Sequence, residues 1–374
     1  MITQSENFQK ALPFALSLGI IPLLWIGASF GGWTVILVPL YAWYLFAILD
    51  AVLGLNLENE DTDTAEEDLF WHRAITMAWF PIQFVNIFGL IWFVTHTDHL
   101  ATWETIVLFF GLGVSSGTIG IVYAHELLHQ RNTLERWLGD LLLSSVLYSH
   151  FRTEHLLVHH VHVGTPRDAV TARYNEGFHK YFFRVLREEA VSAWDAEAAM
   201  LARRKLSPWH PRNPHFRYWT LQIMMLILAV LVGGLPGLGL FVWQAVVAIW
   251  QLELTNYVEH YGLTRRHIGN GKYEHVKPHH SWNATHKASN WLLINLQRHS
   301  DHHIKPDRRY PLLQNHEEDA APQLPFGYAM MGFAALVPPL WRRMMNPRVK
   351  AWRAQFYPDI EDWDDYKHAR HPVA

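Results

Sequence analysis

The 374-residue sequence contains no cysteine, and this absence excludes several kinds of site from the start. Without thiols, the chain has no disulfide, no cysteine-ligated zinc or iron–sulfur cluster and no thiolate-ligated haem. Charged residues are also scarce, at 17% of the chain against roughly 25% in ordinary soluble domains. The net charge of −3 provides no basic field, so we expect no nucleic-acid partner. Any metal must be bound through nitrogen and oxygen atoms.

Half of the residues are hydrophobic, and they form six long apolar stretches. Each stretch is close to the about 20 residues that a helix needs to cross a bilayer, and each is too continuous for an amphipathic soluble helix. We therefore predict an all-α integral membrane protein, one domain over residues 1–374, with a helical, histidine-rich cytoplasmic region. The predicted transmembrane helices are residues 11–32, 34–55, 75–96, 105–124, 218–235 and 238–258. We interpret the shorter stretch 137–149, which Asp140 interrupts, as a buried or interfacial helix.

The placement of Lys and Arg predicts the orientation of these helices. The connections near 31–33, 97–104 and 233–237 contain neither residue, whereas 125–217 and 263–374 contain nearly all of them. Because cytoplasmic segments carry the excess of Lys and Arg, these two segments and both termini are predicted to be cytoplasmic.

The 25 histidines are the most unusual feature, and the informative ones lie in four motifs. These are HELLH (125–129), EHLLVHHVH (154–162), NYVEHYGL (256–263) and LQRHSDHH (296–303). All four lie on the same predicted side of the membrane. Neutral imidazole binds Fe, Zn, Cu or Ni, so the motifs predict a metal site without naming its metal. The candidate ligands are His125, His129, His155, His159, His160, His260, His299, His302 and His303.

The spacing of these histidines suits ligation. His125 and His129 are four residues apart and share one face of a helix. His155 and His159 repeat that spacing, and His160 can reach around the same turn. Nine ligands exceed the four of a tetrahedral zinc, so we expect two metals. Carboxylates beside the ligands, and one further histidine, are expected to orient the imidazoles or to bind metal themselves: Glu126, Glu154, Glu259, Asp301 and His280.

Two other classes of protein remain possible from these residues alone. HELLH also matches the H-E-x-x-H pattern of zinc proteases, but such a protease needs one further ligand rather than seven. A metal transporter or sensor would place ligands along a path across the bilayer, whereas these gather at one side. Soluble carboxylate di-iron bundles depend on glutamates, and histidines dominate here.

The four motifs, with YEHVKPHHSWNATHKASN (273–290) and DRRYPLL (307–313), resemble those of the membrane alkane 1-monooxygenases. The resemblance implies a non-haem enzyme with two iron ions that uses O₂ to hydroxylate medium-chain n-alkanes to 1-alkanols. It further implies electrons from a rubredoxin with its NADH-dependent flavin reductase, and a place in the bacterial inner membrane. The nine histidines match the family's iron ligands, whereas His162 lies outside that set.

The sequence departs from the family's pattern at two places. Gln130 follows the first motif where the family usually has lysine, and the second motif carries apolar Leu156, Leu157 and Val158 between its histidines. Neither change removes a ligand. The second makes the site more apolar, so the sequence does not decide the preferred substrate. The related alternatives are a desaturase and a fatty-acyl or aryl-methyl hydroxylase.

Three further expectations concern residues outside the motifs. Ala42, Trp43 and Phe46 are predicted to line a substrate tunnel along the second span. Asp50 is a costly charge near the end of that span, so we expect it to pair with a basic residue or a histidine, in a structural role or in support of the metal ligands. A cytoplasmic basic surface is expected to dock an acidic electron donor; its candidate residues are Arg131, Arg152 and Arg298.

Overall fold

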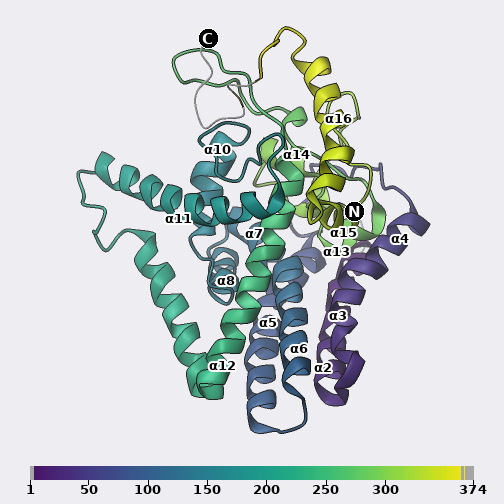
Figure 1. The fold of residues 1–374 in the computed structure, drawn as a ribbon, viewed down its shortest axis with the longest axis vertical. Helices are drawn as coiled ribbons and strands as arrows, with labels where there is room; N and C mark the ends of the chain where they lie inside the picture. The colour runs from purple at the N-terminus through teal and green to yellow at the C-terminus, as the bar shows by residue number, and fades with distance from the viewer. Residues whose placement is uncertain (1–3, 364–365, 367–374) are drawn as a thin grey trace.

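The computed structural model describes residues 4–363 and residue 366, so the end of the predicted cytoplasmic segment 263–374 lies partly outside the described residues. The described residues form helices with three isolated β-bridges and no strand. Figure 1 shows a bundle of long helices in the lower half and, above it, short helices and loops together with the longer helices α11 (Phe178–Arg203) and α16 (Pro338–Phe356). The all-helical prediction is therefore confirmed.

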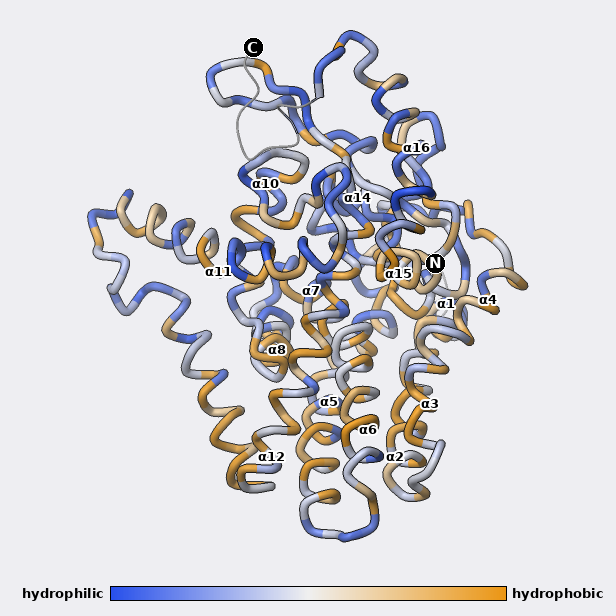
Figure 2. Tube along the Cα trace, viewed as in Figure 1, coloured by the Kyte–Doolittle hydropathy of each residue, from blue (hydrophilic) through white to orange (hydrophobic). Residues whose placement is uncertain are grey.

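Among the residues that the structure describes, five helices are long and apolar enough to cross a membrane. Figure 2 shows them as largely orange tubes in the lower half of the molecule. The five helices are Ser5–Phe30, Gly32–Leu53, Phe70–His96, Thr102–His129 and Pro214–His260. The first four of them agree with the first four predicted spans.

The fifth long helix, α12 (Pro214–His260), covers both of the remaining predicted spans. Its backbone leaves the helical conformation at Gly234, where φ is 62° and ψ is −156°. This region of backbone space is almost restricted to glycine, so Gly234 permits the chain to reverse there. Figure 1 accordingly shows α12 as a V whose two arms meet at the bottom of the molecule.

The other spans are built from shorter helical pieces. The first contains α1 (Gln4–Ala11), η1 (Leu12–Gly19) and α2 (Ile20–Phe30), and the third is α5 (Phe70–His96). The second contains η2 (Gly32–Ile36), α3 (Leu37–Pro39), η3 (Leu40–Leu45) and α4 (Phe46–Leu53). The fourth contains α6 (Thr102–Ser115), η4 (Ser116–Ile121) and α7 (Val122–His129). Both η3 and η4 are single π-helical turns, a form that is rare and often found at functional sites.

The upper region is made of short helices around the motifs and two longer helices, α11 and α16. Its first part contains α8 (Thr133–Ser144), α9 (Phe151–Glu154), the π-turn η5 (His155–His159), α10 (His160–His162) and α11 (Phe178–Arg203). After α12 follow η6 (Pro278–His280), α13 (Lys287–Leu292), α14 (His299–Ile304), η7 (Tyr310–Leu312), α15 (Tyr328–Ala335) and α16 (Pro338–Phe356).

The two acidic residues that interrupt apolar stretches both have partners. Asp140 is buried in α8 and pairs with Arg152 at 2.7 Å and Arg217 at 3.1 Å, which agrees with a short buried helix. Asp50 Oδ1 accepts the backbone N–H of Ser289 at 2.8 Å, in the first turn of α13. A carboxylate at a helix start satisfies an otherwise unpaired amide and the helix dipole, so Asp50 fixes α13 against the second span.

Close packing between α6 and α12 depends on a glycine, which gives a testable prediction. A Cβ atom added to Gly113 would lie 2.5 Å from Val247 Cβ and 2.7 Å from the carbonyl oxygen of Gln244. We expect Gly113→Ala to force the helices apart and to destabilise the protein by about 1–3 kcal/mol, measured as a lower Tm in detergent.

Gly239→Ala is the matched control, because Gly239 lies in α12, the partner helix of α6, and a Cβ added there meets nothing within 4 Å. An equal Tm for the two alanine variants would contradict the close-packing argument.

Candidate metal centre

The nine candidate histidines, far apart in the sequence, converge above the long helices. The structure separates them into two groups, in each of which one nitrogen per residue lies within 4.8 Å of the others. The first group contains His125, His129, His155, His160 and His302. The second contains His159, His260, His299 and His303. His162 belongs to neither group, as expected from the sequence.

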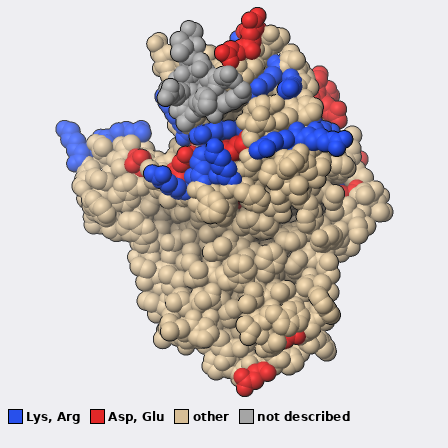
Figure 3. Space-filling model, in the orientation of Figure 1, with Lys and Arg blue, Asp and Glu red and all other residues tan. Residues whose placement is uncertain are grey.

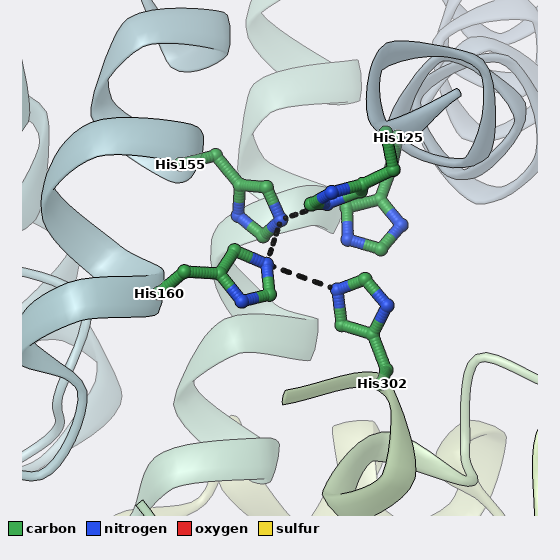
Figure 4. A group of neighbouring side chains, drawn as sticks. His125, His155, His160 and His302 are labelled. Carbon is green, nitrogen blue, oxygen red and sulfur yellow. Dashed lines mark hydrogen bonds between the residues drawn. The ribbon is translucent and has the colours of Figure 1, made fainter. Parts of the chain in front are cut away.

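The first group draws its members from α7, η5, α10 and α14. Figure 4 shows the rings of His125, His155, His160 and His302 facing one another. His155 Nε2 lies 2.9 Å from His129 Nε2 and 2.9 Å from His160 Nε2, which in turn lies 3.1 Å from His302 Nε2. These nitrogens surround a common centre rather than pairing one with another.

Hydrogen bonds alone cannot satisfy this arrangement. An imidazole nitrogen carries either one proton or one lone pair, yet His155 Nε2 and His160 Nε2 each have two close nitrogen neighbours. His125 Nε2 is buried and has no hydrogen-bond partner among the described residues. A cation at the centre would bind these lone pairs and remove the conflict.

The nitrogen spacings also fit a metal with more than four ligands. With metal–nitrogen bonds of about 2.0–2.1 Å, ligands at right angles are about 2.9 Å apart and tetrahedral ligands about 3.4 Å apart. The close contacts in the first group measure 2.9–3.1 Å. Five imidazoles at this spacing fit five- or six-coordination and disagree with a four-ligand zinc site.

Burial keeps these imidazoles neutral. It lowers the pKa of His155, His160 and His302 well below the ordinary value, and positive charge on neighbouring imidazoles would lower each further. A neutral imidazole retains the lone pair that binds a metal. The site is therefore prepared for a cation at neutral pH.

Two buried carboxylates lie against the second group. His159 Nδ1 lies 3.1 Å from Asp168 Oδ2, within hydrogen-bond distance, and His299 Nδ1 lies 3.4 Å from Glu259 Oε1 without a hydrogen bond. A carboxylate that accepts a hydrogen bond from Nδ1–H leaves Nε2 free for a metal and fixes the plane of the ring, as Asp168 does for His159. His299 Nε2 is 3.1 Å from His260 Nε2 and 3.0 Å from His303 Nε2, as in the first group.

The sequence analysis did not identify Asp168. It lies nine residues after His159, beyond the motif, and the loop after α10 returns it to the ring. Its Oδ1 accepts the backbone N–H of Val170 and its Oδ2 the hydroxyl of Thr171, at 3.1 and 2.6 Å, so the carboxylate is already fixed. The TPRDAVT stretch itself gives no sign of this contact.

A π-turn decides which histidine joins which group. We expected His155 and His159 to lie on one helical face, which is wrong. In η5 the helix is wound more loosely, so residues five apart are aligned, and His155 lies beside His160 at 2.9 Å. His159 therefore points to the second group. His125 and His129, in ordinary α-helix, do share one group as predicted.

Three of the five predicted supporting residues make other contacts, and a fourth, Glu154, makes no hydrogen bond with the residues that the structure describes. Glu126 accepts a hydrogen bond from Gln130, and Asp301 pairs with Arg308 and accepts the backbone N–H of Gln314. Asp301 therefore fixes the loop after α14 and does not orient the imidazoles as expected. Neither oxygen of buried Glu154 has a hydrogen-bond partner in the described chain, and burial with nearby carboxylates raises its pKa well above the usual value. Of the predicted set, Glu259 lies against a candidate ligand.

His280, the fifth predicted supporting residue, belongs to a separate cluster with His279, Glu274 and Tyr357. His280 Nδ1 accepts the backbone N–H of Lys277, so Nε2 carries the proton and donates to the Tyr357 hydroxyl at 2.7 Å. That hydroxyl donates to Glu274 at 2.5 Å and also contacts His279 Nε2 at 3.1 Å. These groups satisfy one another, so the cluster stabilises the fold and leaves no lone pair of His280 for a metal.

An apolar cavity of about 100 Å³ adjoins the histidines. His125, His155 and His299 line one part of it, and Ala42, Trp43 and Phe46, the predicted tunnel residues, line another. Trp43 is fixed by a 2.8 Å hydrogen bond from its Nε1 to Gln251 Oε1 and by edge contacts with surrounding rings. All three π-turns contribute residues to the cavity wall.

The three arginines of the expected docking surface differ in exposure. Arg131 has a 90% exposed side chain. Arg152 is mostly covered by its pairing with Asp140. Arg298 is 3% exposed and donates to the carbonyl oxygens of Glu58 and Leu313, so its place on a docking surface is wrong.

Asp168 gives a prediction for the second group. We expect Asp168→Asn to weaken metal binding by about 10- to 100-fold, because the amide no longer holds the Nδ1 proton of His159 as a carboxylate does. Metal content after dialysis against a chelator, measured by mass spectrometry, would report this loss.

Asp301→Asn is the control, since that carboxylate contacts Arg308 instead of a candidate ligand. Full metal retention by the Asp168 variant, or equal loss in both variants, would contradict the assigned roles.

Comparison with known proteins agrees with this site. The family model described as fatty acid desaturase matches residues 101–335, which include all nine histidines. Alkane 1-monooxygenase 2 of Pseudomonas aeruginosa is 38% identical over 313 residues, covering 83% of this chain and 82% of the relative. Alkane 1-monooxygenase 2 of Alcanivorax borkumensis is 37% identical over 324 residues, covering 83% and 84%.

A more distant relative is the xylene/toluene monooxygenase hydroxylase component of Pseudomonas putida, 25% identical over 337 residues. Because the alkane 1-monooxygenases match at higher identity over most of both chains, the resemblance read from the histidine motifs is confirmed. The chain belongs to the alkane 1-monooxygenase family and is an oxidoreductase of the monooxygenase class, with a fatty acid desaturase-type domain.

Proposed function

We propose that this protein hydroxylates the terminal methyl group of medium-chain n-alkanes to give 1-alkanols, using O₂ and two iron ions. The observation that carries the proposal is that two groups of buried imidazoles adjoin one apolar cavity. An n-alkane has no polar handle, so only the shape of an apolar cavity can position it. Iron, when bound, supplies the oxidising chemistry that an unactivated C–H bond requires.

The chain's own residues have three tasks in this proposal. The nine histidines bind the iron ions, five around one and four around the other. Asp168 accepts a hydrogen bond from His159 Nδ1 and keeps that ring in the binding tautomer, and Glu259 lies 3.4 Å from His299 Nδ1. The wall around Trp43 and Phe46 excludes water and aligns the alkane toward the histidines.

We further propose six membrane crossings, with both arms of α12 spanning the inner membrane and both termini in the cytoplasm. The distribution of charge supports this orientation. Figure 3 shows Lys and Arg in a band across the upper half of the molecule and only a few Asp and Glu at the opposite end. Electrons would come from a rubredoxin and its NADH-dependent flavin reductase, docking on the cytoplasmic side.

Metal content and turnover, measured together, test the main proposal. The purified protein in nanodiscs would receive rubredoxin, its reductase, NADH and n-octane. We expect about two irons per chain and 1-octanol as product. A different result would be two irons and no alkanol, but an oxidised aryl methyl group or a desaturated product. The protein would then act as one of the related enzymes, an aryl-methyl hydroxylase or a desaturase. One zinc per chain would contradict the di-iron proposal.

The cavity wall gives a second test. We expect Trp43→Ala to lengthen the range of alkanes converted, because removing the indole and its hydrogen bond to Gln251 enlarges the cavity. Product chain-length profiles by gas chromatography provide the measurement. Trp33→Ala is the control, since Trp33 is 79% exposed and does not line the cavity. An unchanged profile in the Trp43 variant would contradict the assignment.

A further inference from the structure

A second cavity, of about 520 Å³, lies between the start of α11 and the start of α16. Its lining contains none of the nine histidines of the candidate metal centre. Three cationic side chains line it, those of Arg173, Lys180 and Arg342. The cavity therefore has the charge of an anion-binding site.

The acidic residue in this lining does not cancel the cations. Glu176 is buried and bound by two nitrogens of Arg184, Nε to Oε1 at 2.8 Å and Nη2 to Oε2 at 2.9 Å. In a bidentate pair of this kind, the positive guanidinium compensates the negative charge of the carboxylate. The charge of Glu176 is thus compensated by an arginine that does not itself line the cavity.

Two of the cations are available to a ligand. The Lys180 ammonium makes no hydrogen bond or ion pair with the residues that the structure describes. Arg342 is oriented by one hydrogen bond, from Nη2 to the carbonyl oxygen of Asn175 at 3.2 Å, which carries no negative charge. A planar guanidinium held in this way can bind phosphate oxygens through its remaining N–H groups.

An apolar side chain projects beside one of the cations. Phe183 is 74% exposed one turn after Lys180 on α11. Residues three apart on a helix lie on the same face, so Phe183 is beside Lys180. Figure 2 shows α11 just above the orange lower half, at the level where headgroups would meet the protein. A soluble anion would have no use for this exposed phenyl ring.

We propose that the cavity between α11 and α16 binds the phosphate of an anionic phospholipid, with an acyl chain over Phe183. Basic pockets at the cytoplasmic ends of membrane helices bind such headgroups. The exposed phenylalanine beside Lys180 favours a lipid over an acidic soluble protein. The proposal does not depend on the proposed hydroxylation, because it uses none of the same residues.

Native mass spectrometry of the full chain, released from neutral detergent, tests the proposal. Dioleoyl phosphatidylglycerol and dioleoyl phosphatidylcholine are titrated separately. We expect selective retention of phosphatidylglycerol and about 30-fold weaker binding in the double variant Lys180→Gln/Arg342→Gln, since each interfacial cation contributes roughly fivefold. Arg342→Lys should restore most of the affinity, because it keeps the charge.

The matched control is Arg343→Gln/Lys350→Gln, which removes two exposed positive charges from α16 that do not line the cavity. Equal weakening in the two double variants, or equal binding of the two lipids, would overturn the proposal. Displacement of the lipid by millimolar inorganic phosphate would show a site for free anions instead. Unchanged lipid binding with slower reduction by an acidic electron-transfer protein would assign the cavity to protein docking.

Discussion

Nine imidazoles packed beside one another, seven of them buried and two half-buried, need a cation, and much of the upper half of this protein is arranged around that need. Each ring brings a nitrogen lone pair into a place without a matching donor, and a buried lone pair without a partner is costly. Binding of a cation would offset this cost, because the helices hold the rings at spacings that suit coordination, near 3 Å between nitrogens. Removing the cation would leave the rings repelling through their lone pairs.

The backbone supplies this arrangement through departures from regular α-helix. The π-turn η5 rotates His159 away from its neighbours and lets one short segment serve both groups. In α14, ordinary helical spacing separates His302 from the pair His299 and His303, with the same effect. Each of these two segments therefore links the two groups, which fixes one group relative to the other. The other π-turns, η3 and η4, line the apolar cavity beside the rings.

Polar anchors outside the site keep the segments in register. Asp50 ties the second span to α13, and Asp301 with Arg308 and Gln314 fixes the loop after α14. The network of Tyr357, His279, His280 and Glu274 joins the C-terminal part of the chain to the loop before α13. These contacts resemble those around the metal centre in residue type, yet they differ in function because every donor there meets an acceptor.

The sequence by itself determined the all-helical architecture with long apolar helices, the family and the nine candidate histidines that converge, since apolar length and local motif spacing are properties of short segments. Ala42, Trp43 and Phe46, which the sequence analysis assigned to a substrate tunnel, do line the apolar cavity, and their role in substrate binding stays a prediction. Only the tertiary structure decided how the nine rings divide into two groups, that Asp168 rather than Asp301 orients a ring, and that Arg298 is buried. Those outcomes depend on the winding of one π-turn and on contacts between segments distant in the chain, which no local pattern of residues encodes.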